Sequence, residues 1–363
     1  MKSRKLMALL CCAAMSVSLV GCGGSGSSSS STTAAGNEGA EAAGNDAGSS
    51  DNASSTPAAD EKTFNIDLAT NYAADGPAGI ALEKFVNDVA EKSGGSLNIS
   101  LFTDGTLGSA ADNYSSVASG DLDMAMTGLE GLDLYAPEYT FLDSPFLIES
   151  WDHMDALLDS GIGDSLKARY EENGFVTLGW HHRDIRELAS NKEVKAPADV
   201  AGLKLRLPGM TVYVDTWSAL NVSSTTVAMS ELYTALQTKV AEACEGGYEQ
   251  MNTLKLYEVQ DYIAETEHVY EFVGLFINKE LYDSMSENQK TILNECAAES
   301  LAYADQLADE SREEYKQECL DGGMTLVDVD REAFREALSD FYQKQFESKW
   351  TVTTYDEVMS YAK

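Results

Sequence analysis

The stretch Gly202-Leu-Lys-Leu-Arg-Leu-Pro208, near the middle of the chain, indicates the type of fold. Its leucines alternate with Lys204 and Arg206, which predicts a strand over 203–207 with the leucines on one face and the basic residues on the other. Further helices and strands are predicted after it, with a helix over 210–220, a strand over 222–227 and a helix over 229–239. Alternating strands and helices predict a parallel α/β sheet.

Strands and helices are also predicted to alternate in the N-terminal part of the folded chain. Apolar spacing predicts strands over 63–69, 97–102, 122–126 and 176–180, and helices around 82–89 and over 112–118. A much longer helical pattern runs from 287 to about 317, with Leu293, Ala297 and Leu301 on one stripe. It exceeds the usual length of a globular helix, so we expect it to brace two lobes.

Length, charge and cysteine count limit the class of protein. The 363 residues include 60 acidic side chains against 25 Lys and Arg, a net charge of −35, and no basic cluster, which argues against a nucleic-acid partner. A folded part over 61–363 is long for one core and suits two lobes. Its three cysteines, Cys244, Cys296 and Cys319, are an odd number, which argues against a full disulfide framework.

The first 60 residues predict export and lipid anchoring. Basic residues precede an apolar segment over 6–20, which is the pattern of a signal peptide over 1–21. Small residues before Cys22 indicate a lipoprotein-processing site, so a lipidated Cys22 would hold the protein at a membrane surface. Plain secretion is the alternative. Because 23–60 contain no large apolar residue, we expect 22–60 to be a disordered tether.

Two arginines, Arg186 and Arg206, lie at the two ends of the segment 186–206. The chain has only eight arginines, and Arg186 and Arg206 lie close to one another in sequence. A guanidinium held on a strand presents a rigid fork of donors that matches a carboxylate. In so acidic a chain we expect an anionic ligand there. For Arg186 an alternative is a surface arginine paired with its neighbour Glu187.

The sequence contains no Walker loop, Gly-x-Ser-x-Gly or His-Glu-x-x-His motif. The adjacent His181 and His182 would face opposite sides of a strand, so they could not bind one metal ion. No nucleophile–base pair can be picked out among the many acids. We therefore expect no cofactor, no metal site and no enzymatic activity.

Several sequence blocks, taken in order, closely resemble the solute-binding proteins of TRAP (tripartite ATP-independent periplasmic) transporters over nearly all of 62–350. The blocks are Leu-Gly at 107–108, Ser-Gly-Asp-Leu-Asp-Met at 119–124, Leu-Asp-Ser-Pro-Phe-Leu at 142–147, Asp-Val-Ala-Gly-Leu-Lys-Leu-Arg-Leu-Pro at 199–208, Met-Ser-Glu-Leu-Tyr-Thr-Ala-Leu-Gln-Thr at 229–238, Glu-Ala-Cys-Glu at 242–245, Lys-Leu-Tyr-Glu-Val-Gln at 255–260 and Thr-Glu-His at 266–268. Each block is weak alone, but the ordered combination is specific.

This resemblance implies a fold and a division of the chain. The fold would be a two-lobed α/β receptor of the periplasmic-binding-protein type, class II, with crossing strands and a long helix that spans the hinge. Lobe I would comprise 61–183 and 273–310. Lobe II would comprise 184–272 and 311–363.

The resemblance also implies a binding site. In the family, the arginine of the Gly-Leu-Lys-x-Arg block pairs with the substrate carboxylate, which corresponds to Arg206, and a second arginine upstream often assists, which corresponds to Arg186. Other positions that line the family's cleft fall on Asn71, Thr127, Gly128, Gly209, Met229, Glu245, Gly246 and His268. The chain departs from the family pattern at Gly246-Gly247, where many members have Asn-Pro, and at Asp184, where glycine is common. These departures argue against transferring the ligand of any one relative.

Sequence and resemblance together predict an extracytoplasmic receptor, lipid-anchored and monomeric, that binds an organic acid between two lobes and delivers it to TRAP-type permease subunits. The alternative is the ligand-binding subunit of an ABC-type importer or a sensor system. The acid could be a C4-dicarboxylate, a sugar acid, a keto acid or an aromatic acid. Polar cleft positions favour a hydroxylated one.

Overall fold

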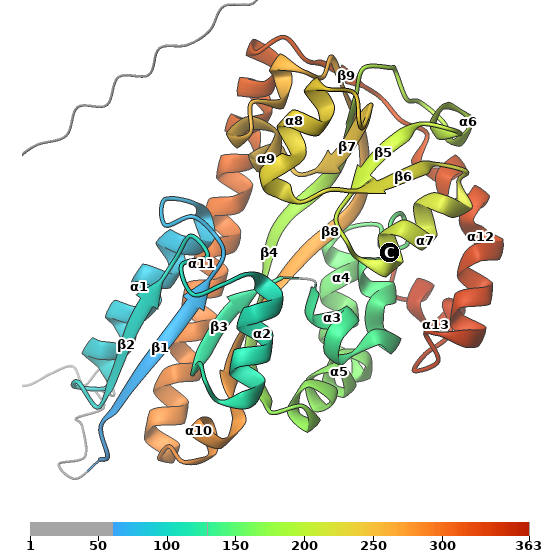
Figure 1. Cartoon of the computed structure of the whole chain (residues 1–363). Helices are drawn as coiled ribbons and strands as arrows, with labels where there is room; N and C mark the ends of the chain where they lie inside the picture. Colours follow the sequence, from blue (N-terminus) through green and yellow to red (C-terminus); the bar gives the residue numbers. More distant parts are fainter. Residues whose placement is uncertain (1–60, 129, 363) are drawn as a thin grey trace, which may run out of the picture. The chain divides into compact units, whose positions relative to one another are not determined.

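The computed structural model describes residues 61–128 and 130–362, which belong to one compact unit (Figure 1). The predicted signal peptide, Cys22 and the tether over 22–60 lie outside the described residues. Among the described residues, no helix combines the length and the apolar character needed to cross a membrane.

A mixed sheet of nine strands forms the centre of the described part of the chain. The strands are β1 (Phe64–Thr70), β2 (Leu97–Phe102), β3 (Met124–Thr127), β4 (Phe175–Ser190), β5 (Lys204–Leu207), β6 (Ser223–Thr226), β7 (Ala243–Gly246), β8 (Tyr262–Asn278) and β9 (Thr325–Val327). Their order is β2-β1-β3-β8-β4-β7-β5-β6, with β9 paired to β8. The central pair β8-β4 therefore separates two outer groups, β1–β3 and β5–β7.

The two outer groups are parallel, but the central strands are not. β1 pairs in parallel with β2 and β3, and β5 pairs in parallel with β6 and β7. β4 and β8 run antiparallel to each other over nearly their whole length, and each is antiparallel to its outer neighbour. The prediction of a parallel sheet is confirmed within each outer group and is wrong at the centre. There, the two long strands β4 and β8 run side by side and connect the two outer groups.

The helices flank this sheet (Figure 1). They are α1 (Pro77–Lys92), α2 (Ala110–Ser119), α3 (Glu130–Tyr135), α4 (Trp151–Leu158), α5 (Gly161–Glu172), α6 (Pro197–Val200), α7 (Thr211–Ala219), α8 (Leu232–Gln237), α9 (Tyr248–Thr253), α10 (Lys279–Asp283), α11 (Glu287–Asp321), α12 (Arg331–Ser348) and α13 (Tyr355–Met359), with short 3₁₀ helices η1 (Pro137–Asp143), η2 (Met229–Glu231) and η3 (Leu256–Glu258).

The predicted long helix is confirmed as α11, which has 35 residues. It begins at a capping box in which Ser286 and Gln289 satisfy each other's backbone amide groups. It contacts α1 beside the first strand group, β4 in the centre and α9 beside the second group. One rigid element thus runs along both halves of the sheet.

Several other elements lie close to their predicted bounds, whereas the central strands do not. The strand predicted over 97–102 is β2, and the one predicted over 203–207 is β5. The strand predicted over 176–180 is only part of β4, and β8 was not predicted. Nearly every residue of β8 is buried, so it lacks the alternation that identifies a half-exposed strand.

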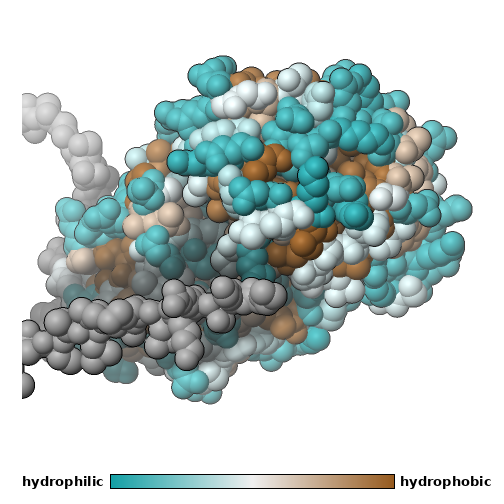
Figure 2. All heavy atoms as spheres, turned by 45° about the horizontal axis from the view of Figure 1, so that its top comes forward, coloured by the Kyte–Doolittle hydropathy of each residue, from teal (hydrophilic) through white to brown (hydrophobic). Residues whose placement is uncertain are grey.

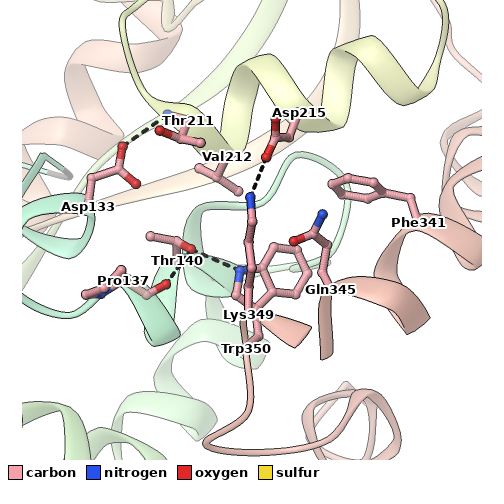
Figure 3. A pocket seen from close by; sticks show the side chains of 10 residues that line it. All are labelled: Asp133, Pro137, Thr140, Thr211, Val212, Asp215, Phe341, Gln345, Lys349 and Trp350. Carbon is pink, nitrogen blue, oxygen red and sulfur yellow. Dashed lines mark hydrogen bonds and ion pairs between the residues drawn. The ribbon is translucent and has the colours of Figure 1, made fainter. Parts of the chain in front are cut away.

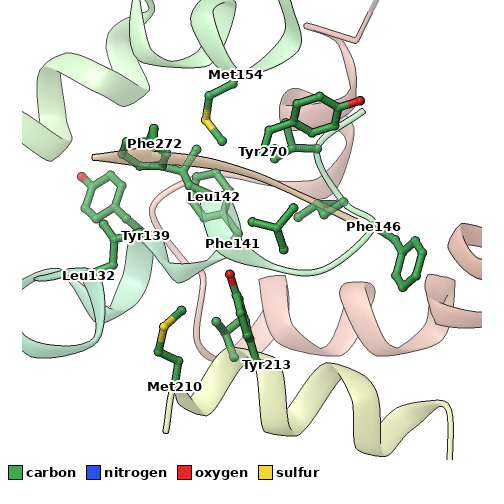
Figure 4. Packing of buried hydrophobic residues seen from close by; sticks show 14 of the residues in the cluster. Leu132, Tyr139, Phe141, Leu142, Phe146, Met154, Met210, Tyr213, Tyr270 and Phe272 are labelled. Atoms are coloured by element: carbon green, nitrogen blue, oxygen red, sulfur yellow. The ribbon is translucent and has the colours of Figure 1, made fainter. Parts of the chain in front are cut away.

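The main hydrophobic core joins segments that lie before and after β4 in the sequence. Figure 4 shows Leu132 and Phe141 packed near Phe272 of β8, with Tyr213 of α7 and Met210, just before α7, on the other side. Met210 also lines the cavity described below, so the core supports the side of that cavity next to β5. Cys244, Cys296 and Cys319 are free and buried.

The predicted lobe boundaries at 183/184 and 272/273 fall inside β4 and β8. At the same place the β4–β8 ladder shifts register between His182 and Asp184. The division into lobes stays a prediction.

Hydrophilic residues cover most of the face drawn in Figure 2, with hydrophobic residues in small patches.

Candidate ligand-binding site

A cavity of about 690 Å³ is lined by residues from both outer strand groups and from the central pair. The first group contributes the segment after β1 and the start of α3. The second contributes the end of β5, the start of α7, the segment after β6, and α9. This volume lies in the range of small-molecule sites.

A smaller cavity of about 250 Å³, lined by α7, η1 and the end of α12, is a weaker candidate (Figure 3). Lys349 there binds Asp215 at 2.7 Å, and Asp133 accepts a hydrogen bond from the amide of Thr211 at 3.0 Å. Trp350 donates to Thr140. Its charged groups therefore already have partners, and it contains no arginine. The larger cavity has arginines in its wall.

Arg206, on β5, lines the larger cavity with part of its guanidinium unpaired. Its Nε donates to the carbonyl of Val227 at 2.8 Å, which orients the group. Among the described residues, no carboxylate forms an ion pair with Arg206. Burial lowers the pKa of Arg206, and the charge of Glu245 offsets this only in part. The result is an oriented cation, 3% exposed, that lacks a counter-ion.

Arg186, on β4, lines the same cavity but is fully engaged with glutamates. It binds both carboxylate oxygens of Glu245, at 2.6 and 2.9 Å, and one oxygen of Glu271 at 2.7 Å. Burial is the largest single influence and opposes the charged form of Arg186, but Glu245, Tyr213 and Glu271 together outweigh it and raise the pKa of the guanidinium. The alternative that Arg186 is a surface arginine paired with Glu187 is wrong, since Arg186 is buried and Glu187 binds Arg312.

A third arginine, Arg183, lies near Arg186 on β4. We call Arg183, Arg186 and their glutamate partners around β4 and β8 the floor of the cavity. Arg183 binds Glu271 at 3.0 Å and Glu249 at 3.1 Å, and it lies over the ring of Tyr72. Two residues three apart on a regular strand would point to opposite faces. The register shift between His182 and Asp184 inserts Arg183 as an extra residue, so both arginines reach Glu271.

Three glutamates line the cavity together with the three arginines: Glu130, Glu249 and Glu271. The formal charges of these six side chains cancel. Burial opposes ionisation of Glu271, but Arg183 and Arg186 outweigh it and lower the pKa of that carboxyl group. At Glu130 burial dominates and raises the pKa. The two glutamates in the same cavity are therefore shifted in opposite directions: the pKa of Glu271 is lowered and the pKa of Glu130 is raised.

Half of the predicted site residues line the cavity: Asn71, Arg186, Arg206, Gly209 and Met229. The other half lie outside it: Thr127, Gly128, Glu245, Gly246 and His268.

The predicted residues outside the cavity mostly support it from behind. Glu245 and His268 are fully buried, and His268 Nε2 lies 3.2 Å from the Glu245 carboxylate that holds Arg186. Arg186 and His268 together outweigh the effect of burial and lower the pKa of Glu245 to about 2. At Gly128, a Cβ atom would lie 2.8 Å from the hydroxyl of Tyr72, so glycine leaves room for Tyr72. Thr127 is buried in β3.

The departures from the family pattern have a structural explanation. A Cβ atom on Gly247 would lie 1.6 Å from Asp184 Oδ2, and one on Gly246 would lie 2.4 Å from the amide of Gln250. Asp184 in turn accepts from Arg312 of α11 at 2.8 Å. The space opened by the two glycines is therefore filled by Asp184 and Gln250, and Asp184 connects the long helix to β4.

Sequence reasoning missed Tyr72, Glu130, Arg183, Glu249 and Glu271. The scarcity of arginine would have identified Arg183, which lies three residues before Arg186. The glutamates carried no usable signal, because 60 acids are spread over the chain. Among the described residues, no group of three or more His, Cys, Asp or Glu side chains is placed to hold a metal ion.

Comparisons with known proteins agree with this architecture. The sequence pattern of bacterial extracellular solute-binding protein, family 7, matches residues 68–349. A solute-binding protein of Roseobacter denitrificans is 32% identical over 262 residues, covering 72% of this chain and 80% of that protein. Its structure with bound L-galactonate superimposes with a TM-score of 0.73 and 28% identity, covering 84% of this chain and 100% of that one.

Two further relatives have different named ligands. The 2,3-diketo-L-gulonate-binding periplasmic protein YiaO of Escherichia coli is 30% identical, covering 74% of this chain and 82% of that protein. The C4-dicarboxylate-binding periplasmic protein DctP of Vibrio cholerae is 27% identical, with the same coverage of 74% and 82%. The chain belongs to family 7 of the bacterial extracellular solute-binding proteins, the receptors of TRAP transporters, which bind solutes and are not enzymes.

Proposed function

We propose that this receptor binds an organic carboxylate in the 690 Å³ cavity, with Arg206 as the main anchor. The observation that carries the proposal is the difference among the three arginines. Arg183 and Arg186 have carboxylate partners within the protein, whereas Arg206 is oriented by Val227 and has none among the described residues. A bound carboxylate would supply the missing counter-ion.

The strength expected from Arg206 suits a transport receptor. Each charge-assisted hydrogen bond contributes about 1.5–3 kcal/mol. Two such bonds to one ligand carboxylate would contribute about 3–6 kcal/mol. A micromolar affinity corresponds to about 8 kcal/mol, so Arg206 would supply a large share of it.

Binding would be coupled to closure of the two predicted lobes, 61–183 with 273–310 and 184–272 with 311–363. The cavity draws its walls from both strand groups, which the long strands β4 and β8 connect. Only a closed arrangement gives a ligand contacts from both sides, so the ligand shifts the equilibrium towards closure. Of the other predicted site residues, the three that line the cavity, Asn71, Gly209 and Met229, would then contact the ligand.

The closed receptor would deliver its acid to TRAP-type permease subunits. We further propose that lipid on Cys22 and the tether over 22–60 keep the receptor at the membrane surface, and that it acts as a monomer. Membership of family 7 supports the TRAP assignment over an ABC-type importer or a sensor. Processing and lipidation at Cys22 would be detected by mass spectrometry of the protein recovered from membranes.

A thermal-shift screen of the purified protein against organic acids tests the proposal. An acid at a hundred times its dissociation constant should stabilise the protein by about 2.7 kcal/mol, which raises the melting temperature by several degrees. Arg206→Ala should abolish the shift. A shift produced only by neutral sugars or peptides, or an unchanged response of Arg206→Ala, would contradict the carboxylate proposal.

A further inference from the structure

Glu130 differs from the other acids that line the cavity. It is the first residue of α3, in the part of the chain that follows β3, whereas Arg206 lies on β5 in the second strand group. Among the described residues, no other side chain donates a hydrogen bond or forms an ion pair to the Glu130 carboxylate. Its ionised form therefore lacks the partners that stabilise Glu249 and Glu271.

The unpaired charges in the cavity consist of one cation and one anion. Arg183 joins Glu249 and Glu271, and Arg186 joins Glu271 and Glu245, so each of these side chains has a partner of opposite charge, and the group carries one excess negative charge. Arg206 and Glu130 remain. A ligand that contacts both must present an anionic group to Arg206 and hydrogen-bond donors to Glu130.

A second carboxylate on the ligand would have no cation left to bind. At Glu130 it would face another negative charge within a partly buried site, where like charges repel more strongly than in water. A hydroxyl group can instead donate a charge-assisted hydrogen bond to Glu130. Asn71, Tyr72 and Thr226 also line the cavity and offer further uncharged polar groups for hydroxyls.

We infer that the ligand is a monocarboxylate with several hydroxyl groups, and that Glu130 is a specificity-determining residue that rejects dicarboxylates. This inference rests on the proposed carboxylate-binding function. It selects one ligand class among relatives that are named for both a keto sugar acid and C4-dicarboxylates.

Two matched pairs of sugar acids test the inference. Galactonate and galactarate, and likewise gluconate and glucarate, differ only in whether the end distant from the first carboxylate is a hydroxymethyl group or a second carboxylate. Isothermal titration calorimetry with the purified protein should show that the monoacid of at least one pair binds about tenfold or more tightly than its diacid.

Glu130→Gln keeps the size of the side chain and removes its charge. It should reduce the ratio of the two affinities at least about fivefold, by weakening monoacid binding and relieving repulsion of the diacid. Glu83→Gln, at an exposed position of α1 outside the cavity, removes the same charge and should leave the ratio unchanged. Equal or tighter diacid binding by the natural protein, no binding by any of the four acids, or an unchanged ratio in Glu130→Gln would overturn the inference.

Arg206→Ala separates this inference from the proposed function. If Arg206→Ala abolishes binding of whichever acid is bound while Glu130→Gln leaves the ratio unchanged, carboxylate recognition stands and the role of Glu130 is wrong. If Arg206→Ala binds acids normally, the anchor itself is wrong, and the inference fails with it.

Discussion

The β5 wall and the β4–β8 floor of the cavity use the same residue type for different purposes. On the wall, Arg206 is oriented by one carbonyl and has no counter-ion among the described residues. On the floor, Arg183 and Arg186 are enclosed by Glu245, Glu249 and Glu271. An arginine in a binding cavity is thus available to an anion only when the protein has not already neutralised it. We therefore expect the floor to provide rigidity and the wall to provide affinity.

The largest expected effect comes from one substitution made at both places. Arg186→Met should lower the free energy of unfolding by about 3–5 kcal/mol, because Glu245 and Glu271 would lose a buried partner. Arg206→Met, in the absence of ligand, should change it by less than about 1 kcal/mol, since the loss of one hydrogen bond is offset by removal of a desolvated charge. Urea denaturation of both variants measures the contrast. Similar losses at the two positions would contradict the division into wall and floor.

Ligand affinity should respond in the opposite order. Arg206→Ala is expected to weaken acid binding at least about a hundredfold, which corresponds to about 2.7 kcal/mol. Arg206→Lys should also weaken binding markedly, because an ammonium group cannot reproduce the planar fork of donors. Calorimetric titration measures both, with Lys204→Ala, exposed on the same strand, as the control. An affinity kept by Arg206→Lys would show that charge alone is sufficient.

Tight packing should also distinguish the floor from the wall. Gly247→Ala would place a Cβ atom 1.6 Å from Asp184 Oδ2 and displace the partner of Arg312. We expect a loss of about 1–3 kcal/mol of stability. Gly209→Ala, whose Cβ atom would meet only a methyl group of Thr226 at 3.7 Å, should cost less than about 0.5 kcal/mol. Combining Asp184→Gly with Gly247→Ala should recover the steric part of the loss, and failure to recover it would point to another cause.

The smallest expected effect is a pH dependence of ligand preference. Burial raises the pKa of Glu130 above its ordinary value of 4.5, so protonation of Glu130 increases as the pH falls towards that raised value. Protonated Glu130 no longer repels a second carboxylate. The preference for galactonate over galactarate should therefore narrow by a few fold between pH 7 and pH 5. Glu130→Gln reports the titration of the ligands alone, so an equal narrowing in this variant would assign the effect to the ligands.

The sequence by itself determined the local elements that carry Arg206, the proposed anchor. The alternation over 203–207 placed Arg206 on a strand, and the helical pattern from 287 identified the long helix. These features depend on side chains a few residues apart, so a short window contains the whole signal. The ordered family blocks added the two-lobed fold.

Only the tertiary structure decided which charges are available. β8 is buried on both faces and lacks an alternating pattern, so its pairing with β4 and the position of Glu271 had no local signal. In a regular strand, Arg183 and Arg186 would point to opposite faces of the sheet. The extra residue at Arg183 lets both side chains reach Glu271 on the same side. The sequence makes both Arg186 and Arg206 candidates for binding an anion, but Glu245, 59 residues after Arg186, pairs with Arg186 and leaves Arg206 without a counter-ion among the described residues. Availability of a charge depends on long-range pairing, which no short stretch of sequence contains.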